Sequence, residues 1–201
     1  MGPNLFLAFQ ITNPELIANL RKVLYTCVEK ENGLKDFIAP LETAHVTLDV
    51  FRVETENLAD AKLMLQDVFD RHIKTIWKEV GKSVTFKGLD MFGKTVLFAR
   101  PDQGSDFLQK VHKVFRKALE DAGIGINGYK DYNPHLTLLQ VKTSKENQLK
   151  EIPKACLENM ENVELGSQEV KQIQLLSISK QKDSVGYYHC EDVYNLAEKE
   201  C

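Results

Sequence analysis

The sequence contains two copies of one short pattern of polar residues. His45 and Thr47 lie in "AHVTL", and His135 and Thr137 lie in "PHLTL". Residues two apart along a strand point to the same face, about 6.5 to 7 Å from each other. Each copy therefore predicts an imidazole beside a hydroxyl on one face of a strand.

Facing each other across a cleft, the two copies would form a site suited to a phosphate. An imidazole has an unperturbed pKa of about 6.5, so two of them can divide the roles of base and acid near neutrality. Threonine hydroxyls can donate hydrogen bonds to non-bridging phosphate oxygens and hold the charge that develops during attack. This chemistry needs no metal and no other cofactor, and the sequence leaves open which histidine is the base.

A single His-x-Thr is usually ordinary strand sequence, with a half-buried histidine and a β-branched threonine. Random placement of the five histidines and ten threonines along the chain predicts only about 0.25 such pairs. Two pairs, each followed by leucine, favour a functional interpretation. We therefore predict that His45, Thr47, His135 and Thr137 are catalytic.

The other histidines are weaker candidates. His72 and His112 lie in helical runs among charged residues, which is typical of solvated or partly packed side chains. His189 precedes Cys190, but neighbours on a strand point to opposite faces, so the two residues are not expected to bind a metal together. We predict no metal site.

Three aromatic residues are candidates for contact with the substrate. Phe92 and Tyr132 could stack on a nucleobase, and Tyr188 lies in "GYYHCE" near the end of the chain. An aromatic residue at a strand or loop edge is more often part of the core. A packing role for these residues therefore stays open.

Composition narrows the class of protein. The 201 residues, 43% of them hydrophobic, can bury one substantial core, and the formal charge of −3 favours a small anionic ligand over a long polynucleotide. The longest apolar run, Leu5 to Phe9, is far short of the roughly 20 residues that span a bilayer. The four cysteines lack C-x-x-C spacing, which favours a reducing compartment. We expect a cytoplasmic or nuclear protein without membrane contact.

Hydrophobic periodicity predicts an α+β fold without a linker between domains. Strand and helix alternate at the start of the chain, and a cap at Ser105 and a stop at Gly123 bound a later helix. The segment 144–167 reads as loop with a short helix. The expected strands lie near residues 5–11, 46–53, 82–92, 96–101, 135–141, 169–179 and 184–190, and the expected helices near 14–28, 55–69 and 105–121.

The sequence resembles the 2H phosphoesterases, a superfamily with two His-x-Thr/Ser motifs, and within it the central nucleotide-binding domain of the A-kinase anchoring proteins. The resemblance rests on four ordered stretches between Pro3 and Glu191: "PNLFLAFQITN", "AHVTL", "NPHLTL" and "GYYHCE". It implies a bilobal fold in which two antiparallel-rich sheets face a central cleft with helices outside. Residues 1–201 are then expected to form one bilobal domain.

The resemblance also implies activity on 2′-5′ oligoadenylates, 2′,3′-cyclic phosphates or RNA ends, and binding of AMP or CMP between the lobes. His45, Thr47, His135 and Thr137 match the motif positions without substitution. Only eleven residues follow Cys190, with no amphipathic helix long enough to dock a kinase regulatory subunit, so this partner is not supported by the chain. We expect a monomer. A nucleotide sensor without catalysis, or a scaffold with a vestigial cleft, are the alternatives to an enzyme.

Overall fold

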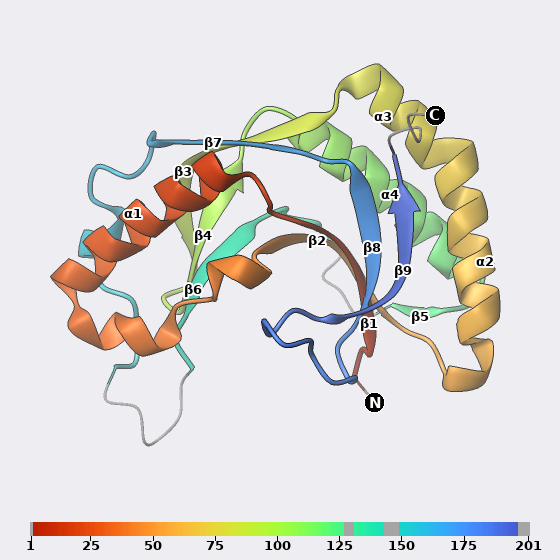
Figure 1. Ribbon diagram of the computed structural model, residues 1–201, viewed down its shortest axis with the longest axis horizontal. Helices are drawn as coiled ribbons and strands as arrows, with labels where there is room; N and C mark the ends of the chain where they lie inside the picture. Colours follow the sequence, from red (N-terminus) through yellow and green to blue (C-terminus); the bar gives the residue numbers. More distant parts are fainter. Residues whose placement is uncertain (1, 127–130, 143–148, 197–201) are drawn as a thin grey trace.

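The computed structural model describes residues 2–126, 131–142 and 149–196 and confirms the expected α+β fold (Figure 1). Its strands are β1 Leu5–Gln10, β2 His45–Arg52, β3 Ser83–Phe92, β4 Val96–Pro101, β5 Gly125–Ile126, β6 Leu136–Gln140, β7 Glu164–Glu169, β8 Gln172–Ser177 and β9 His189–Asn195. Its α-helices are α1 Pro14–Lys30, α2 Leu58–Val68, α3 Lys74–Val80 and α4 Ser105–Asp121. A π-helical segment, Phe69–Ile73, joins α2 to α3, and short 3₁₀ helices lie at Asn32–Phe37, Leu41–Thr43, Thr55–Asn57 and Lys154–Leu157.

The strands pair antiparallel in the order β7-β3-β4-β6-β2-β1-β8-β9, with β5 added beside β2. We call β2-β1-β8-β9 the first lobe and β6-β4-β3-β7 the second lobe. Each lobe begins with a strand that starts at a His-x-Thr motif and continues outward through three more strands. The lobes meet between β2 and β6, where the residues paired are Val46 and Leu136. The two expected sheets are thus joined into one at the centre of the molecule.

Each of the two long helices packs on the lobe opposite to the one that contains the strand before it. Helix α1 follows β1 of the first lobe, yet it packs against β7 of the second, and Asn19 donates a hydrogen bond to the carbonyl of Leu165. Helix α4 follows β4 of the second lobe, yet it packs against β2 and α2 beside the first. Figure 1 shows α1 and α4 on opposite sides of the molecule, α1 beside β7 and α4 beside α2. The side of the sheet away from these helices is left for the site.

The ends of the long helices follow the expected signals with one correction. Asn13 caps α1 by accepting a hydrogen bond from the Glu15 amide, and Pro14 is the first helical residue. Ser105 does not cap α4, because the N-cap is Gly104 and Ser105 already lies in the helix. Gly104 has a φ of +86°, a conformation that glycine adopts without the steric cost of a Cβ atom.

Two strand predictions near the C-terminal end need correction. Strand β7 begins at Glu164, within the segment 144–167 that was predicted to be loop and short helix, and it pairs with β3. The final strand begins at His189 rather than near Ser184, because residues 183–187 form a closed turn. Residues 144–148 of the predicted loop lie outside the described ranges.

Candidate active site

The strand pairing at the centre of the sheet brings the two motifs together. Val46 and Leu136 are paired and fully buried, and each lies between the histidine and the threonine of its motif. In antiparallel strands, residues before the paired position on one strand face residues after it on the other. His45 therefore lies on the side of Thr137, and Thr47 on the side of His135. Because side chains alternate, all four point to the face opposite the buried Val46 and Leu136.

Each motif is followed by the same irregularity in its strand. The pairing of β1 with β2 passes from Thr47 to Asp49, and the pairing of β4 with β6 passes from Thr137 to Leu139. Leu48 and Leu138 are thus extra residues in β-bulges, and both are buried. A bulge bends the strand and increases its local twist. The leucine of His-x-Thr-Leu therefore marks the point where each strand turns away from the site.

The two imidazoles are held in the same way. Nδ1 of His45 donates a hydrogen bond to the carbonyl of Thr43 (2.9 Å), and Nδ1 of His135 donates to the carbonyl of Asn133 (2.8 Å). A carbonyl oxygen can only accept, so Nδ1 must carry the proton. In the neutral ring, Nε2 is then the acceptor. Among the described residues, neither Nε2 nor the hydroxyl of Thr47 or Thr137 has a hydrogen-bond partner.

His45 is the more enclosed of the two histidines. Burial is the main cause that lowers the pKa of His45 below its ordinary value, and the positive charges of Lys182 and His135 lower it further. The hydrogen bond to Thr43 opposes these effects by stabilising the charged ring. His45 is consequently neutral at neutral pH, with Nε2 able to accept a proton.

Aromatic rings surround both histidines. Phe6 and Tyr188 lie 5.4 and 5.6 Å from His45, measured between ring centroids. Phe92 approaches His135 edge to face at 4.8 Å and stacks on Phe98 at 4.2 Å. On the first lobe a small apolar cluster supports these rings, made up of Phe6, Ala8, Leu176 and Tyr187 with Val50 and Tyr188 against it. Such packing restricts how far each imidazole can turn.

The three predicted substrate contacts lie in different surroundings. Phe92 and Tyr188 are half-buried beside the histidines, so a contact between these rings and a base stays a prediction that fits their position. Tyr132 stacks on His112 at 4.2 Å and donates its hydroxyl to the carbonyl of Thr47 (2.9 Å). In this position Tyr132 links the segment before His135 to the first motif.

Behind β2 lies a polar network that the sequence did not predict. The Asp49 carboxylate is fully buried and pairs with Arg116 of α4 at 2.5 Å. His112 donates Nδ1–H to the carbonyl of Leu48 (2.7 Å) beside them. Burial raises the pKa of Asp49, while Arg116 opposes that rise. The spacing of His112 and Arg116, one helical turn apart, indicates that the two side chains lie on the same face of a helix. Nothing in the sequence identified β2 as the element that this face contacts.

The remaining histidines and the surface agree with the location of the site. His72 is exposed in the π-helical segment, and His189 is exposed at the start of β9. Within the described ranges, no group of three or more histidine, cysteine or acidic side chains is placed to hold a metal ion.

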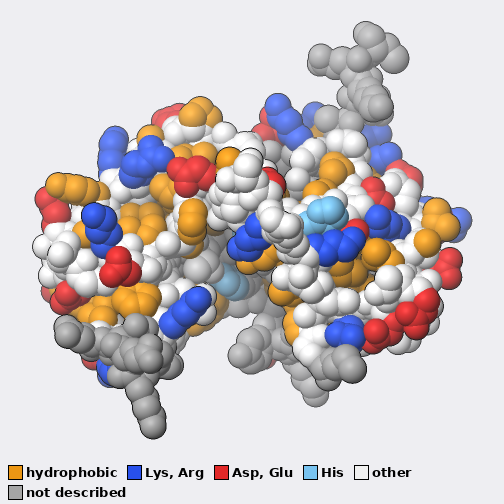
Figure 2. Space-filling model, turned by 60° about the horizontal axis from the view of Figure 1, so that its bottom comes forward, with side chains coloured by type: hydrophobic (Ala, Val, Ile, Leu, Met, Phe, Trp, Pro, Cys, Tyr) orange, Lys and Arg blue, Asp and Glu red, His pale blue; other side chains and the backbone are white. Residues whose placement is uncertain are grey.

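Figure 2 shows a hollow between the two lobes, with histidine atoms in it and basic side chains beside it. Two other concave regions, one near Gln168 and one along α1 at Tyr25, include no motif residue.

Comparison with known proteins identifies the family. The family model described as "AKAP7 2'5' RNA ligase-like domain" matches residues 3–196. The chain belongs to this family. It is 27% identical over 208 residues to human A-kinase anchor protein 7 isoform gamma, covering 98% of this chain and 58% of that protein. The chain thus spans little more than half the length of this AKAP7 relative.

Solved structures of 2H phosphoesterases share the fold. Escherichia coli LigT complexed with 3'-AMP has a TM-score of 0.60 at 14% identity, covering 98% of this chain and all of that one. TT0787 of Thermus thermophilus has a TM-score of 0.58 at 18% identity, with the same coverage. The PDE domain of MHV ns2 has a TM-score of 0.58 at 14% identity, covering 88% of this AKAP7-like chain and all of that one. In the part of the chain that the structure describes, none of the helices has the length and apolar character needed to cross a membrane.

Proposed function

We propose that the protein is a metal-independent phosphodiesterase that acts on 2′-5′-linked oligoadenylates or on 2′,3′-cyclic phosphates at RNA ends. The observation that carries this proposal is the pair of imidazoles, each with Nδ1 bonded to a carbonyl and Nε2 unpartnered among the described residues. Two such rings beside two available hydroxyls provide a base, an acid and donors for a phosphate.

For a 2′-5′ linkage, the base removes the proton of the neighbouring 3′-hydroxyl, which attacks phosphorus. The acid gives its proton to the leaving 5′-oxygen, and a 2′,3′-cyclic phosphate is formed. For a cyclic substrate, water replaces the hydroxyl as nucleophile. Thr47 and Thr137 donate hydrogen bonds to the non-bridging oxygens, where negative charge increases in the transition state.

We assign the base to His45 and the acid to His135. His45 is neutral at neutral pH because burial lowers its pKa, so it is in the form that accepts a proton. The rate should rise as pH rises through the pKa of His45, which places the acidic limb below pH 6.5. A profile of log kcat/KM between about pH 4 and 10 should be bell-shaped, with an optimum within about a unit of neutrality. In slow residual activity, His45→Ala should lack the acidic limb and His135→Ala the basic limb; the reverse result contradicts the assignment.

A nucleotide sensor is the second candidate, because the same donors can hold a phosphate in its ground state. The solved LigT structure complexed with 3'-AMP has the same fold, and the human relative is named as an anchor protein. In this function the protein binds AMP or CMP between the lobes and presents a surface to a partner.

A substrate panel separates the two candidates. We expect cleavage of 2′-5′ oligoadenylate or of a 2′,3′-cyclic nucleotide, little cleavage of 3′-5′ oligoadenylate, and equal rates with and without EDTA. Calorimetry with AMP and CMP should accompany the panel. Tight mononucleotide binding with no turnover on any member would replace the enzyme with the sensor, and loss of activity in EDTA would contradict the metal-free mechanism.

A further inference from the structure

A closed turn between β8 and β9 brings Lys182 and Tyr188 side by side. The Asp183 amide donates to the carbonyl of Tyr187 (2.9 Å), and Asp183 Oδ1 accepts from the amides of Val185 (3.0 Å) and Tyr187 (2.8 Å). Gly186, with a φ of +86°, completes the turn. Lys182 and Tyr188 are the residues directly before and after this closed turn, so it fixes their separation.

Lys182 lies at the rim of the His45 site. Its Nζ is 4.1 Å from the centroid of the Tyr188 ring, and that ring lies edge to face with His45 and with Phe6. Lys182 is exposed, and among the described residues no carboxylate lies within ion-pair distance of it. The charge of Lys182 acts on His45, since it contributes to the lowered pKa of that imidazole.

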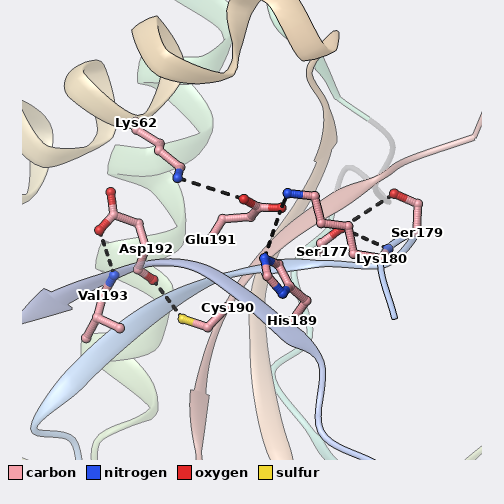
Figure 3. A network of polar contacts seen from close by, with 9 residues as sticks. All are labelled: Lys62, Ser177, Ser179, Lys180, His189, Cys190, Glu191, Asp192 and Val193. Carbon is pink, nitrogen blue, oxygen red and sulfur yellow. Dashed lines mark hydrogen bonds and ion pairs between the residues drawn. The ribbon is translucent and has the colours of Figure 1, made fainter. Parts of the chain in front are cut away.

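Residues 178–181, which we call the arm, lead from β8 to Lys182. Polar contacts around Glu191 hold this arm (Figure 3). The Glu191 side chain, only 5% exposed, lies 2.6 Å from Lys180 and 3.8 Å from both Lys62 and His189. The Lys180 amide also donates to Ser177 Oγ (3.2 Å). Figure 3 shows Lys62 reaching this cluster from α2, so the arm is tied both to β9 and to a helix. The charge of Lys180 is thus paired with a buried carboxylate, whereas the charge of Lys182, two residues later, is available to a ligand.

We propose that Lys182 is a phosphate-binding residue of the site, which contacts a non-bridging oxygen of the phosphate held by the two His-x-Thr motifs. A contact with an aromatic ring at an exposed position is weak, so Lys182 can exchange it for a charge-assisted hydrogen bond to an anion. Because His45 is neutral before the reaction, Lys182 supplies positive charge on the first lobe that the imidazole does not. This inference rests on the proposed phosphate-directed function and names a further residue for it.

The test compares Lys182→Ala, Lys182→Arg and a matched control, Lys113→Ala, which removes an exposed lysine from α4. Hydrogen bonds to charged groups correspond to losses of roughly 10-fold to 100-fold, so Lys182→Ala should weaken AMP binding and lower kcat/KM by that factor. Adenosine, which lacks the phosphate, should bind the variant and the parent equally. Lys182→Arg should restore most of the loss, and Lys113→Ala should match the parent.

The pH profile gives a second readout. Removing the Lys182 charge should raise the pKa of His45 and move the acidic limb to higher pH, and Lys182→Arg should leave the limb near its parental position. Unchanged AMP affinity and unchanged kcat/KM in Lys182→Ala, with His45→Ala inactive, would overturn the role of Lys182 alone. If His45→Ala and His135→Ala also kept full activity and AMP affinity, the proposed function itself would fail. Equal loss of AMP and adenosine binding would contradict a phosphate contact.

Discussion

His45→Ala and His135→Ala should each lower kcat by at least about 10² to 10⁴-fold on whichever substrate the parent cleaves, because each removes the group that transfers a proton. Both side chains lie on the cleft face, and their ring contacts are with half-buried or buried aromatic residues, so the fold should survive. Steady-state turnover by purified variants measures the effect. His72→Ala is the matched control, since His72 is exposed on a helix away from both motifs.

The effect of His45→Ala and of His135→Ala on turnover should also be larger than their effect on AMP binding. AMP affinity should fall less than turnover, because the threonines and the remaining histidine still contact the phosphate. Circular dichroism should report an unchanged fold for all three variants. Near-parental turnover in either His45→Ala or His135→Ala would rule out the two-histidine mechanism.

Arg116→Ala should lower the free energy of unfolding by about 3–5 kcal/mol, the range found when one partner of a buried ion pair is removed. The Asp49 side chain has no exposed surface, and its Oδ2 already lacks a hydrogen-bond partner, so the carboxylate would lose its main compensating charge. Urea denaturation measures the change. Lys117→Ala is the control on the same helix, because Lys117 pairs with Asp121 at the surface and its removal should leave the midpoint unchanged.

The polar network of Asp49, His112 and Arg116 behind β2 should affect catalysis only indirectly. Asp49 follows the bulge after Thr47, and His112 and Tyr132 bind the carbonyls of Leu48 and Thr47, so the network positions the strand that carries His45. An Arg116→Ala protein with parental stability would show that this ion pair does not hold α4 on β2.

The site was predictable where its chemistry depends on local spacing. His-x-Thr on a strand fixes which side chains share a face, and the repetition of the motif indicated that two such faces meet. Helices α1 and α4 were also predictable, since each has regular apolar spacing over 17 residues, whereas α3 was not predicted. These signals arise within a few residues of chain.

Features that depend on distant pairing were missed. Strand β7 has the sequence "ELGSQE", in which Gly166 has a φ of +121° and only Leu165 and Gln168 are buried, so it lacks the alternation of a typical strand. The partners Asp49 and Arg116 lie 67 residues apart in the sequence. Lys182 resembles any exposed lysine in the sequence. The turn at Asp183 sets its contact with Tyr188 locally, but only the folded sheet places Tyr188 beside His45. The positions of β7, of the Asp49–Arg116 pair and of Tyr188 beside His45 are therefore not encoded by a local pattern.

The exchange of α1 and α4 between the lobes makes the two halves of the chain dependent on each other for folding. The apolar face of α1 covers strands that are synthesised after it, and part of the surface beside β2 is covered by a helix that follows β4. A fragment ending before β3 would leave α1 without the strands it covers and β2 without α4. We therefore expect the lobes to unfold in one cooperative transition, and the many contacts between residues distant in sequence favour slow folding. Because each lobe is covered by a helix that follows a strand of the other lobe, the two lobes have little freedom to move apart. The separation of His45 and His135 is therefore set by the folded chain and not by ligand binding.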